Sequence, residues 1–380
     1  IDLLFDLNHL SEEDLPYLGI LKAVLGYMDT ANYSYSELAN EINLATGGIS
    51  STLNLFVNAE DDSKWDARYE VCVKVLAPQL ARAMELVAEI LSGTDLSDGK
   101  RLHEILSQVK SRLEIGMTTS GHMVSAVRAM SYFSPSGAFS DAVGGIGLYR
   151  LIAEIERDFD AHAAQLQERL GSLIRQIFVR DGLLVSETIE AGGRDALAPE
   201  LEKLCAVLPE HADRSRALTI TCEKKNEGFK DAAQIQYVSR SGNFKKAGFA
   251  YTGALNILKV IINYEYLWLN IRVQGGAYGC MSGFGRNGDS YLSSYRDPNL
   301  RATNEIYEGI PAYLHDFDVD ERDMTKFIIG TVSALDTPLP PATKGVRSLS
   351  AYMSGLTVET VQKNREEVLR ATPADIRALE

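Results

Sequence analysis

The sequence has few of the residues from which proteins build metal and redox sites. Its four cysteines form no Cys-x-x-Cys pair, a pattern typical of a reducing compartment or of simple burial. Its six histidines are scattered, and no two of them lie within one helical turn. The chain therefore has neither HExxH nor HxxEH, the paired histidines of zinc-hydrolase helices. We expect no metal ligand and no catalytic residue in these 380 residues.

Other common signatures are missing as well. There is no GxSxG nucleophile elbow and no P-loop, and the GxGxxG letters at Gly283–Gly288 are expected between two strands instead of between a strand and a helix. No apolar run approaches the roughly 18 residues of a membrane span, and no secretory signal is visible. These absences argue against a nucleotide-binding, serine-hydrolase or membrane-spanning protein.

Acidic residues outnumber basic ones, but only in the first part of the sequence. Residues 1–212 contain 17 Lys and Arg against 32 Asp and Glu, whereas residues 213–380 contain 21 against 20. The net charge of −14 thus comes from the first part alone. This excess of negative charge argues against binding of nucleic acid and favours basic partners. The ordinary surface of an acidic soluble protein would also explain the same charge counts.

The length predicts two domains. A chain of 380 residues exceeds what one hydrophobic core usually covers. The polar segment 209–230, with one short strand candidate at 217–222, is the best linker, so we place one domain at 1–212 and another at 213–380. The chain begins inside a predicted strand and stops just after a helix start, so we expect a fragment whose second domain is truncated at its C-terminal end.

Hydrophobic periodicity predicts an α+β fold. Apolar residues at three-to-four-residue spacing indicate helices at 12–29, 34–45, 78–93, 98–115, 120–132, 145–178, 197–207, 250–272, 300–315, 320–333, 344–354 and 357–369. The long run at 145–178 is either one helix or a broken one. Short runs between turn signals indicate strands at 1–8, 49–58, 67–75, 183–189, 232–239, 276–284 and 289–296. Adjacent strands form hairpins while helices come in runs, so each domain should contain an antiparallel or mixed sheet with helices packed mainly on one side.

The most informative segment is Ile-Arg-Val-Gln-Gly-Gly-Ala-Tyr-Gly at 271–279. A helix should end there, with Gly275 and Gly276 supplying the positive backbone dihedrals that let the chain reverse. Arg272 on the last helical turn and Tyr278 on the outgoing strand would then face one spot beside bare backbone. A guanidinium fork and a phenol suit peptide carbonyls or a terminal carboxylate. The plainer alternative is that Arg272 caps a helix C-terminus and Tyr278 fills a strand.

An internal comparison favours the functional interpretation. An earlier segment repeats the order of helix, glycine pair and strand, with Gly47-Gly48 as the pair. Leu44 and Ser50 occupy the positions of Arg272 and Tyr278 in this first copy. If Arg272 served only to cap a helix C-terminus, the first copy should also tend to carry a cation at the equivalent position, where it has Leu44. The repeated order further indicates two versions of one domain.

Several stretches carry a family resemblance. Arg272–Gly279 (RVQGGAYG), Ser294–Leu300 (SYRDPNL) and Asp336–Gly345 (DTPLPPATKG) resemble the C-terminal half of the pitrilysin/insulinase-type zinc metallopeptidases, in the branch of presequence protease and falcilysin. Asp6–Leu10 (DLNHL) and Thr46–Ile49 (TGGI) resemble the start of that half. The resemblance covers essentially the whole chain.

The resemblance implies that the two domains are the third and fourth of four. In this family two bowl-like halves enclose a chamber that admits peptides and excludes folded proteins. The first half carries HxxEH and the zinc ion, and this chain has no such half. The second half contributes an arginine and a tyrosine that bind the substrate backbone, which Arg272 and Tyr278 match, with Gly275 and Gly276 holding them in register.

The implied partners are the N-terminal catalytic half of the same polypeptide and unfolded peptides, with a preference for basic ones. We expect no binding to nucleic acid or to a membrane. The implied location is the cytoplasm of a bacterium or an organelle matrix of a eukaryote. The alternative function is a catalytically silent scaffold or binding subunit of the same superfamily. The presence of both Arg272 and Tyr278 argues against it, because a pure scaffold needs neither.

Overall fold

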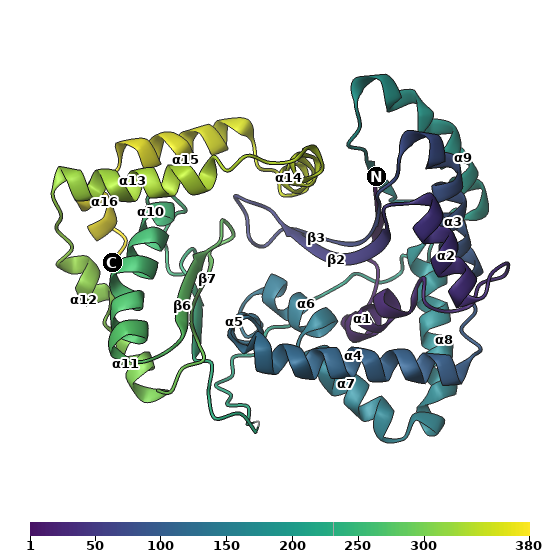
Figure 1. Cartoon of the computed structure of the whole chain (residues 1–380), viewed down its shortest axis with the longest axis horizontal. Helices are drawn as coiled ribbons and strands as arrows, with labels where there is room; N and C mark the ends of the chain where they lie inside the picture. The colour runs from purple at the N-terminus through teal and green to yellow at the C-terminus, as the bar shows by residue number, and fades with distance from the viewer. Residues whose placement is uncertain (231) are drawn as a thin grey trace.

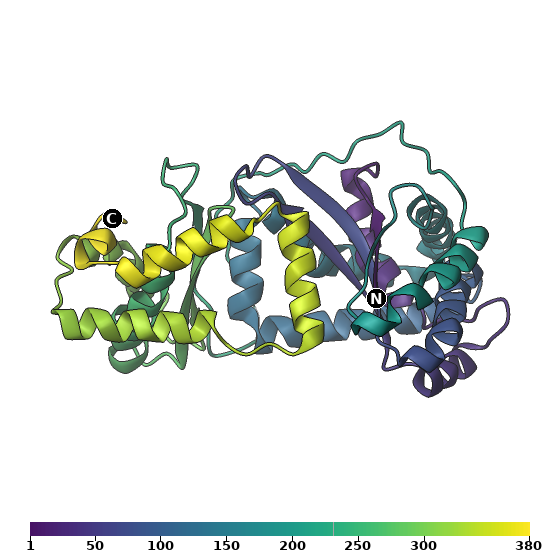
Figure 2. The same ribbon diagram turned by 90° about the horizontal axis from the view of Figure 1, so that it is seen from above.

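The computed structural model describes residues 1–230 and 232–380. It has an α+β fold with two hydrophobic clusters, one formed by residues between Leu3 and Leu218 and the other by residues between Val238 and Ile376. The two clusters lie side by side in an elongated molecule (Figures 1 and 2). We call the part with β1–β4 and α1–α9 the first unit, and the part with β5–β7 and α10–α16 the second unit.

The first unit is built on a four-stranded sheet in the order β2-β3-β1-β4, with every neighbouring pair antiparallel. The strands are β1 (Asp2–Asp6), β2 (Ile49–Val57), β3 (Trp65–Val73) and β4 (Leu184–Ser186). Alternate residues of β3 are buried from Ala67 to Val73, the pattern of a strand with one face on the core. Strand β1 is buried throughout, because it lies inside the sheet between β3 and β4.

Helices surround this sheet and fill the first unit. They are η1 (Glu12–Asp14), α1 (Leu15–Val24), α2 (Tyr35–Ala45), η2 (Ala77–Gln79), α3 (Leu80–Gly93), α4 (Gly99–Thr119), α5 (Gly121–Met130), α6 (Pro135–Gly144), α7 (Ile146–Arg157), α8 (Phe159–Ile177), η3 (Ala191–Ala196) and α9 (Ala198–Val207). The core joins sheet to helix through Phe178, whose ring meets Phe5 and Tyr69 edge to face at centroid distances of 5.1 and 5.2 Å. This is the favoured arrangement of aromatic pairs.

The second unit has a three-stranded antiparallel sheet in the order β5-β7-β6. Its strands are β5 (Ser239–Asn243), β6 (Gly279–Phe284) and β7 (Asp289–Tyr295). Its helices are α10 (Ala254–Ile261), the π-helix η4 (Ile262–Gln274), α11 (Arg301–Glu308), α12 (Ile310–His315), α13 (Glu321–Leu335), α14 (Pro341–Met353), α15 (Val358–Arg370) and α16 (Pro373–Arg377). Helix α10 and the π-helix η4 cover one face of the sheet (Figure 1).

The two glycine pairs occupy equivalent places in the two sheets. In each unit the strand after the pair, β2 or β6, is an edge strand that pairs with the next strand along the chain. That next strand, β3 or β7, also pairs with the strand that precedes the helix, β1 or β5. The predicted repeat of helix, glycine pair and strand is therefore present in the structure as well as in the sequence.

Small side chains join the two units. Helix α5 of the first unit packs on the second sheet (Figure 1), where Ser125 Oγ lies 2.7 Å from Ser239 Oγ. Ser239 Oγ lies 2.7 Å from Ser293 Oγ, which donates to the carbonyl of His122 at 3.0 Å. At Gly121 an added Cβ would lie 2.2 Å from the Tyr237 ring. The close approach of helix and sheet therefore depends on residues with little or no side chain.

The connection between the units is an irregular strap on the surface of the first unit. Residues 209–230 contain no helix or strand, so the strand predicted at 217–222 is wrong. The backbone N–H of Leu218 donates to the Asn8 carbonyl at 2.7 Å, and the N–H of Thr221 donates to the Glu12 carboxylate at 2.7 Å. The segment satisfies these backbone donors with scattered acceptors of the first unit, and a strand partner is not needed.

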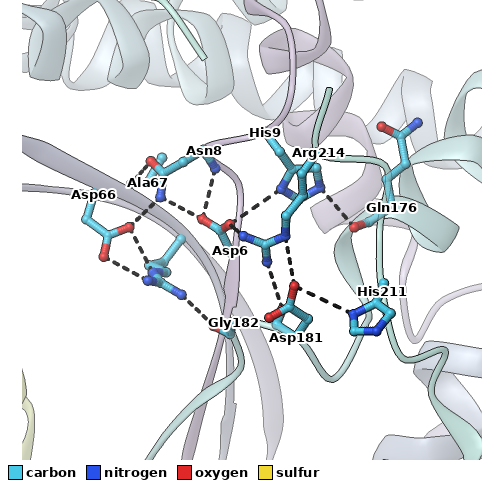
Figure 3. Close-up of polar contacts among 11 residues, drawn as sticks. Asp6, Asn8, His9, Asp66, Ala67, Gln176, Asp181, Gly182, His211 and Arg214 are labelled. Carbon is cyan, nitrogen blue, oxygen red and sulfur yellow. Dashed lines mark hydrogen bonds and ion pairs between the residues drawn. The ribbon is translucent and has the colours of Figure 1, made fainter. Parts of the chain in front are cut away.

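A polar cluster fastens the start of this strap (Figure 3). Arg214 lies 2.9 Å from the Asp6 carboxylate and 3.1 Å from that of Asp181. Asp6 also accepts the backbone N–H of Asn8 at 3.0 Å, and His9 Nδ1 lies 3.5 Å away. Burial raises the pKa of Asp6, but the hydrogen bonds with His9 and Asn8 and the charge of Arg68 outweigh burial and hold that pKa well below its usual range. Residues 6–10, which carry part of the family resemblance, thus anchor the strap.

Two other predictions about secondary structure need correction, and one helix of the structure was not expected. The strand predicted at 232–239 lies at Ser239–Asn243 in the described part of the chain, because Gln236 only bridges to Asp297 before β5 pairs with β7. Helix α6 was not predicted, since its glycine and serine content resembles a turn. The helix predicted at 250–272 continues to Gln274 and changes from α to π geometry at Ile262.

Candidate functional site

Arg272 lies between two aromatic rings at the end of the π-helix η4. Its guanidinium carbon is 4.0 Å from the centroid of the Trp268 ring and 5.5 Å from that of Tyr278. Arginine favours such stacking because its planar cation is weakly hydrated and is attracted to the faces of aromatic rings. In residues 1–230 and 232–380 the Arg272 guanidinium makes no hydrogen bond and no ion pair, so its N–H groups are available to a ligand.

Tyr278 is exposed beside this arginine. Its side chain is 64 % exposed, and its backbone N–H donates to the Tyr295 carbonyl at 3.0 Å, which fixes the residue at the start of the outgoing strand. Its ring meets the Tyr295 ring edge to face at 5.7 Å. Arg272 and Tyr278, six residues apart in sequence, therefore face one spot, as their spacing around the glycine pair predicted.

The two glycines of the pair act in different ways. Gly276 has a φ of +78°, in the left-handed region that residues with a Cβ disfavour. Gly275 has a φ of −82°, so the expectation of positive dihedrals at both positions is wrong for this residue. An added Cβ at Gly275 would lie 2.6 Å from the carbonyl oxygen of Ile271. Gly275 is therefore needed for space, and Gly276 for backbone conformation.

The segment that follows β7 holds the hinge in place. The Asn299 side chain donates to the carbonyl of Gly275 at 2.6 Å. Asp297, which is fully buried, accepts the backbone N–H of Asn299 at 2.8 Å and the hydroxyl of Thr303 at 2.7 Å. Most of the SYRDPNL motif thus has a structural explanation: it ties the turn that carries Arg272 and Tyr278 to the sheet.

Aromatic residues continue the site toward the first unit. Tyr295 contacts the ring of His122 at 4.8 Å and that of Tyr237 at 5.8 Å. His122 lies at the start of α5, so the first unit contributes to the surroundings of the site. Burial lowers the pKa of His122, which favours its neutral form next to the rings. Sequence reasoning missed His122, since nothing near it in the chain indicates that α5 packs on the second sheet.

Trp268 is the other contributor that sequence reasoning missed. Its position four residues before Arg272 is a signal that was present in the sequence, since side chains at this spacing lie on one face of a helix. Exposed apolar side chains extend along the same π-helix and its surroundings: Tyr264, Trp268, Leu269, Val273, Tyr278 and Leu300. Such a patch around an unpaired cation is typical of a surface that another molecule covers.

The first glycine pair, Gly47-Gly48, has no cation at the position that corresponds to Arg272. Gly48, like Gly276, has a positive φ, of 126°, so the backbone turn is repeated. Leu44 stands at the position of Arg272 and is 80 % exposed. The hinge is therefore a shared structural feature, whereas the cation with its flanking rings belongs to the second unit alone.

The residues that the structure describes do not form a zinc site. In the parts that the structure describes, no group of three or more His, Cys, Asp or Glu side chains is placed to hold a metal ion. The buried carboxylate of Asp6, next to His9, is already paired with Arg214. No described helix is long and apolar enough to cross a membrane.

Comparisons with known proteins agree with this architecture. Two family descriptions match the chain: the domain associated with subfamily C of the M16 peptidases over residues 1–155, and "PreP C-terminal domain" over residues 226–379. Protein HypA of Clostridium perfringens is 35 % identical over 378 residues, which are all of this chain and 39 % of that protein. Presequence protease 1, chloroplastic/mitochondrial, of Arabidopsis thaliana is 29 % identical over 383 residues, 99 % of this chain and 35 % of that protein.

Solved structures share the fold. A conserved protein from Enterococcus faecalis superposes with a TM-score of 0.64 at 15 % identity, over all of this chain and 90 % of that one. A peptidase M16 inactive domain from Pseudomonas fluorescens gives 0.62 at 12 % identity, over 99 % and 88 %. The chain spans less than two fifths of the length of the curated relatives named above. It belongs to the M16 peptidase family, in the presequence protease branch, and corresponds to the C-terminal half of those proteins.

Proposed function

We propose that this chain is the substrate-binding, chamber-forming half of a zinc metallopeptidase that degrades unfolded oligopeptides. The observation that carries the proposal is the half-buried Arg272 cation, which contacts the rings of Trp268 and Tyr278 and has no hydrogen-bond or ion-pair partner for its guanidinium inside the described chain. A buried structural arginine normally pairs its donors, whereas a ligand-binding one keeps them free. Membership of the presequence protease branch supports a peptide as the ligand.

In this proposal Arg272 and Tyr278 bind the backbone of an extended peptide. The guanidinium donates to a peptide carbonyl, and the tyrosine hydroxyl lies close enough to donate to the same group or to its neighbour. When the carbonyl oxygen gains negative charge during hydrolysis, both donors stabilise it. Zinc, bound by the N-terminal half of the same polypeptide, would supply an activated water. The acidic first unit would favour basic peptides.

The experiment compares this chain with a polypeptide that also contains the N-terminal half. We expect the isolated chain to hydrolyse no peptide and to retain no stoichiometric zinc, and the longer polypeptide to cleave unfolded peptides in a chelator-sensitive way. One tightly held zinc per isolated chain, with chelator-sensitive cleavage, would contradict the assignment of roles.

A catalytically silent scaffold is the second candidate. The observation that favours it is that a solved structure with the same fold is described as a peptidase M16 inactive domain. A scaffold predicts that the longer polypeptide binds peptides without cleaving them, and that substitutions at Arg272 change nothing but binding.

A further inference from the structure

A second candidate site lies in the first unit, away from the aromatic site. It is a cavity of about 620 Å³ lined by residues of strands β2 and β3 and of the helices α1, α2, α3 and α4. Its walls are mainly aliphatic and include Ile42, Ile49, Val71, Ile90 and Leu113. The volume is within the range of roughly 300–1,000 Å³ that is usual for sites of small ligands.

Two cations line this apolar cavity without any carboxylate. Lys22 comes from α1 and is half-buried, and Arg112 comes from α4 and is exposed. Neither makes an ion pair or hydrogen bond in the described parts of the chain, and no lining residue is acidic. The first 212 residues contain 32 acidic side chains against 17 basic ones. Carboxylates are thus abundant in this unit yet missing from these walls.

The positive charges of Lys22 and Arg112 are unfavourable in this cavity unless an anion binds beside them. Burial, and then the positive charge of Arg112, lower the pKa of Lys22, because an ammonium loses hydration and faces a like charge. A bound carboxylate would relieve both effects and accept hydrogen bonds from the two cations. The lining of the cavity therefore favours an anionic ligand with an apolar body.

The backbone at the cavity indicates which kind of anion. Residues 48–51 line it, and strand β2, an edge strand of its sheet, begins among them at Ile49. The outer N–H and C=O groups of an edge strand can pair with an extended peptide, while neighbouring pockets receive its side chains. A peptide C-terminus offers a carboxylate, a strand-forming backbone and apolar side chains together, whereas a fatty acid has no backbone to pair.

We propose that this cavity binds the C-terminal carboxylate of a peptide with apolar terminal residues, with Lys22 and Arg112 as its anion-binding pair. The proposal rests on the proposed function, because it assumes that unfolded peptides are the ligands of this chain. It adds a second attachment point, in the first unit, to the backbone-binding site at Arg272.

The test measures binding of acetyl-Gly-Ser-Ala-Leu-Leu, with a free C-terminus, to the 380-residue chain by calorimetry. We expect the C-terminal amide of this peptide, and the variants Lys22→Met and Arg112→Met, each to weaken binding at least tenfold. Lys100→Met, at the exposed start of α4, is the matched control and should leave the Kd unchanged. Lys22→Met should keep or raise the melting temperature, because it removes an unpaired half-buried cation.

Each outcome separates this inference from the proposed function. If Arg272→Ala abolishes binding of the probe while Lys22→Met does not, the peptide binds at the aromatic site alone, and the cavity inference is wrong although the proposed function stands. Equal binding of acid and amide, or no binding at millimolar peptide, overturns the inference. Decanoate that binds in the cavity when the peptide does not would assign the site to fatty acids instead.

Discussion

The guanidinium carbon of Arg272 lies 4.0 Å from the centroid of the Trp268 ring, one turn earlier on the same π-helix. This contact holds the cation beside the ring, while its N–H groups have no hydrogen-bond partner in the described parts of the chain. π-helical turns are rare and are frequently found at functional sites. Here the π geometry, the glycine turn and the SYRDPNL segment together place Arg272 beside Tyr278.

Replacing either residue should reduce catalysis without reducing stability. In the polypeptide that contains both halves, we expect Arg272→Ala to lower kcat/KM about 100- to 1,000-fold, the usual effect of losing one donor to a developing oxyanion, and Tyr278→Phe to act in the same direction. The melting temperature and zinc content should change little, because Tyr278 is 64 % exposed and the Arg272 guanidinium has no hydrogen-bond or ion-pair partner within the described residues.

Tyr264→Phe is the matched control for this pair. Tyr264 is 68 % exposed on the same π-helix, and its substitution should leave kcat/KM unchanged. Full activity in both site variants would end the assignment of Arg272 and Tyr278 to substrate binding. Loss of activity together with a large fall in melting temperature would instead indicate a structural role.

Trp268 should act as a positioning residue. Trp268→Ala removes the ring that orients Arg272, a contact of about 0.5–1 kcal/mol at exposed sites, so kcat/KM should fall roughly two- to fivefold. Trp268→Phe should restore most of the loss, because a smaller ring still stacks. Leu269→Ala, which removes an exposed neighbour, should have no effect, and an equal loss in that variant would mean that the patch acts only through its apolar area.

The two glycines should respond differently to substitution. Gly276→Ala forces a residue with a Cβ into the left-handed region, at about 1–2 kcal/mol, and Gly276→Asn should cost less, because asparagine tolerates this conformation. At Gly275 asparagine should be no better than alanine, since any Cβ meets the Ile271 carbonyl. Urea unfolding of the four variants measures this. Equal rescue by asparagine at both positions would contradict the division of roles.

The strap between the units should loosen in acid. Hydrogen bonds from Arg128 lower the pKa of Glu227 to about 2, from an ordinary value of 4.5, and Arg128 Nε lies 2.7 Å from this carboxylate. A group with a lowered folded pKa stabilises the fold above its unfolded pKa and loses that effect as the pH falls through its folded pKa. The contribution of Glu227 should therefore decline between about pH 4.5 and pH 2.

Comparing the chain with its Glu227→Gln variant tests this dependence. The difference in urea midpoint should be present at pH 7 and shrink toward pH 2, because a protonated glutamate and a glutamine carry the same charge. Glu223→Gln, which removes an exposed carboxylate of the same strap, is the control. A difference that persists unchanged at pH 2 would show that the Arg128 contact does not depend on charge.

Much of this protein follows from interactions between near neighbours in the chain, which the local pattern of residues records. Apolar spacing located most helices, and the glycine pair with its flanking strand identified the repeated hinge, because a chain reversal with positive φ requires glycine within a few residues. The order RVQGGAYG brought Arg272 and Tyr278 to one spot, because the two residues flank a single local turn.

The remaining features depend on packing between elements that are distant in sequence. His122 lies next to Tyr295 because α5 packs on the second sheet. Lys22 and Arg112 line the same cavity because α1 and α4 both form its walls. The segment predicted as a strand at 217–222 is irregular because acceptors far away in the sequence, on Asn8 and Glu12, satisfy its donors. Local periodicity indicates only that a face is apolar, and it does not indicate which surface will cover that face.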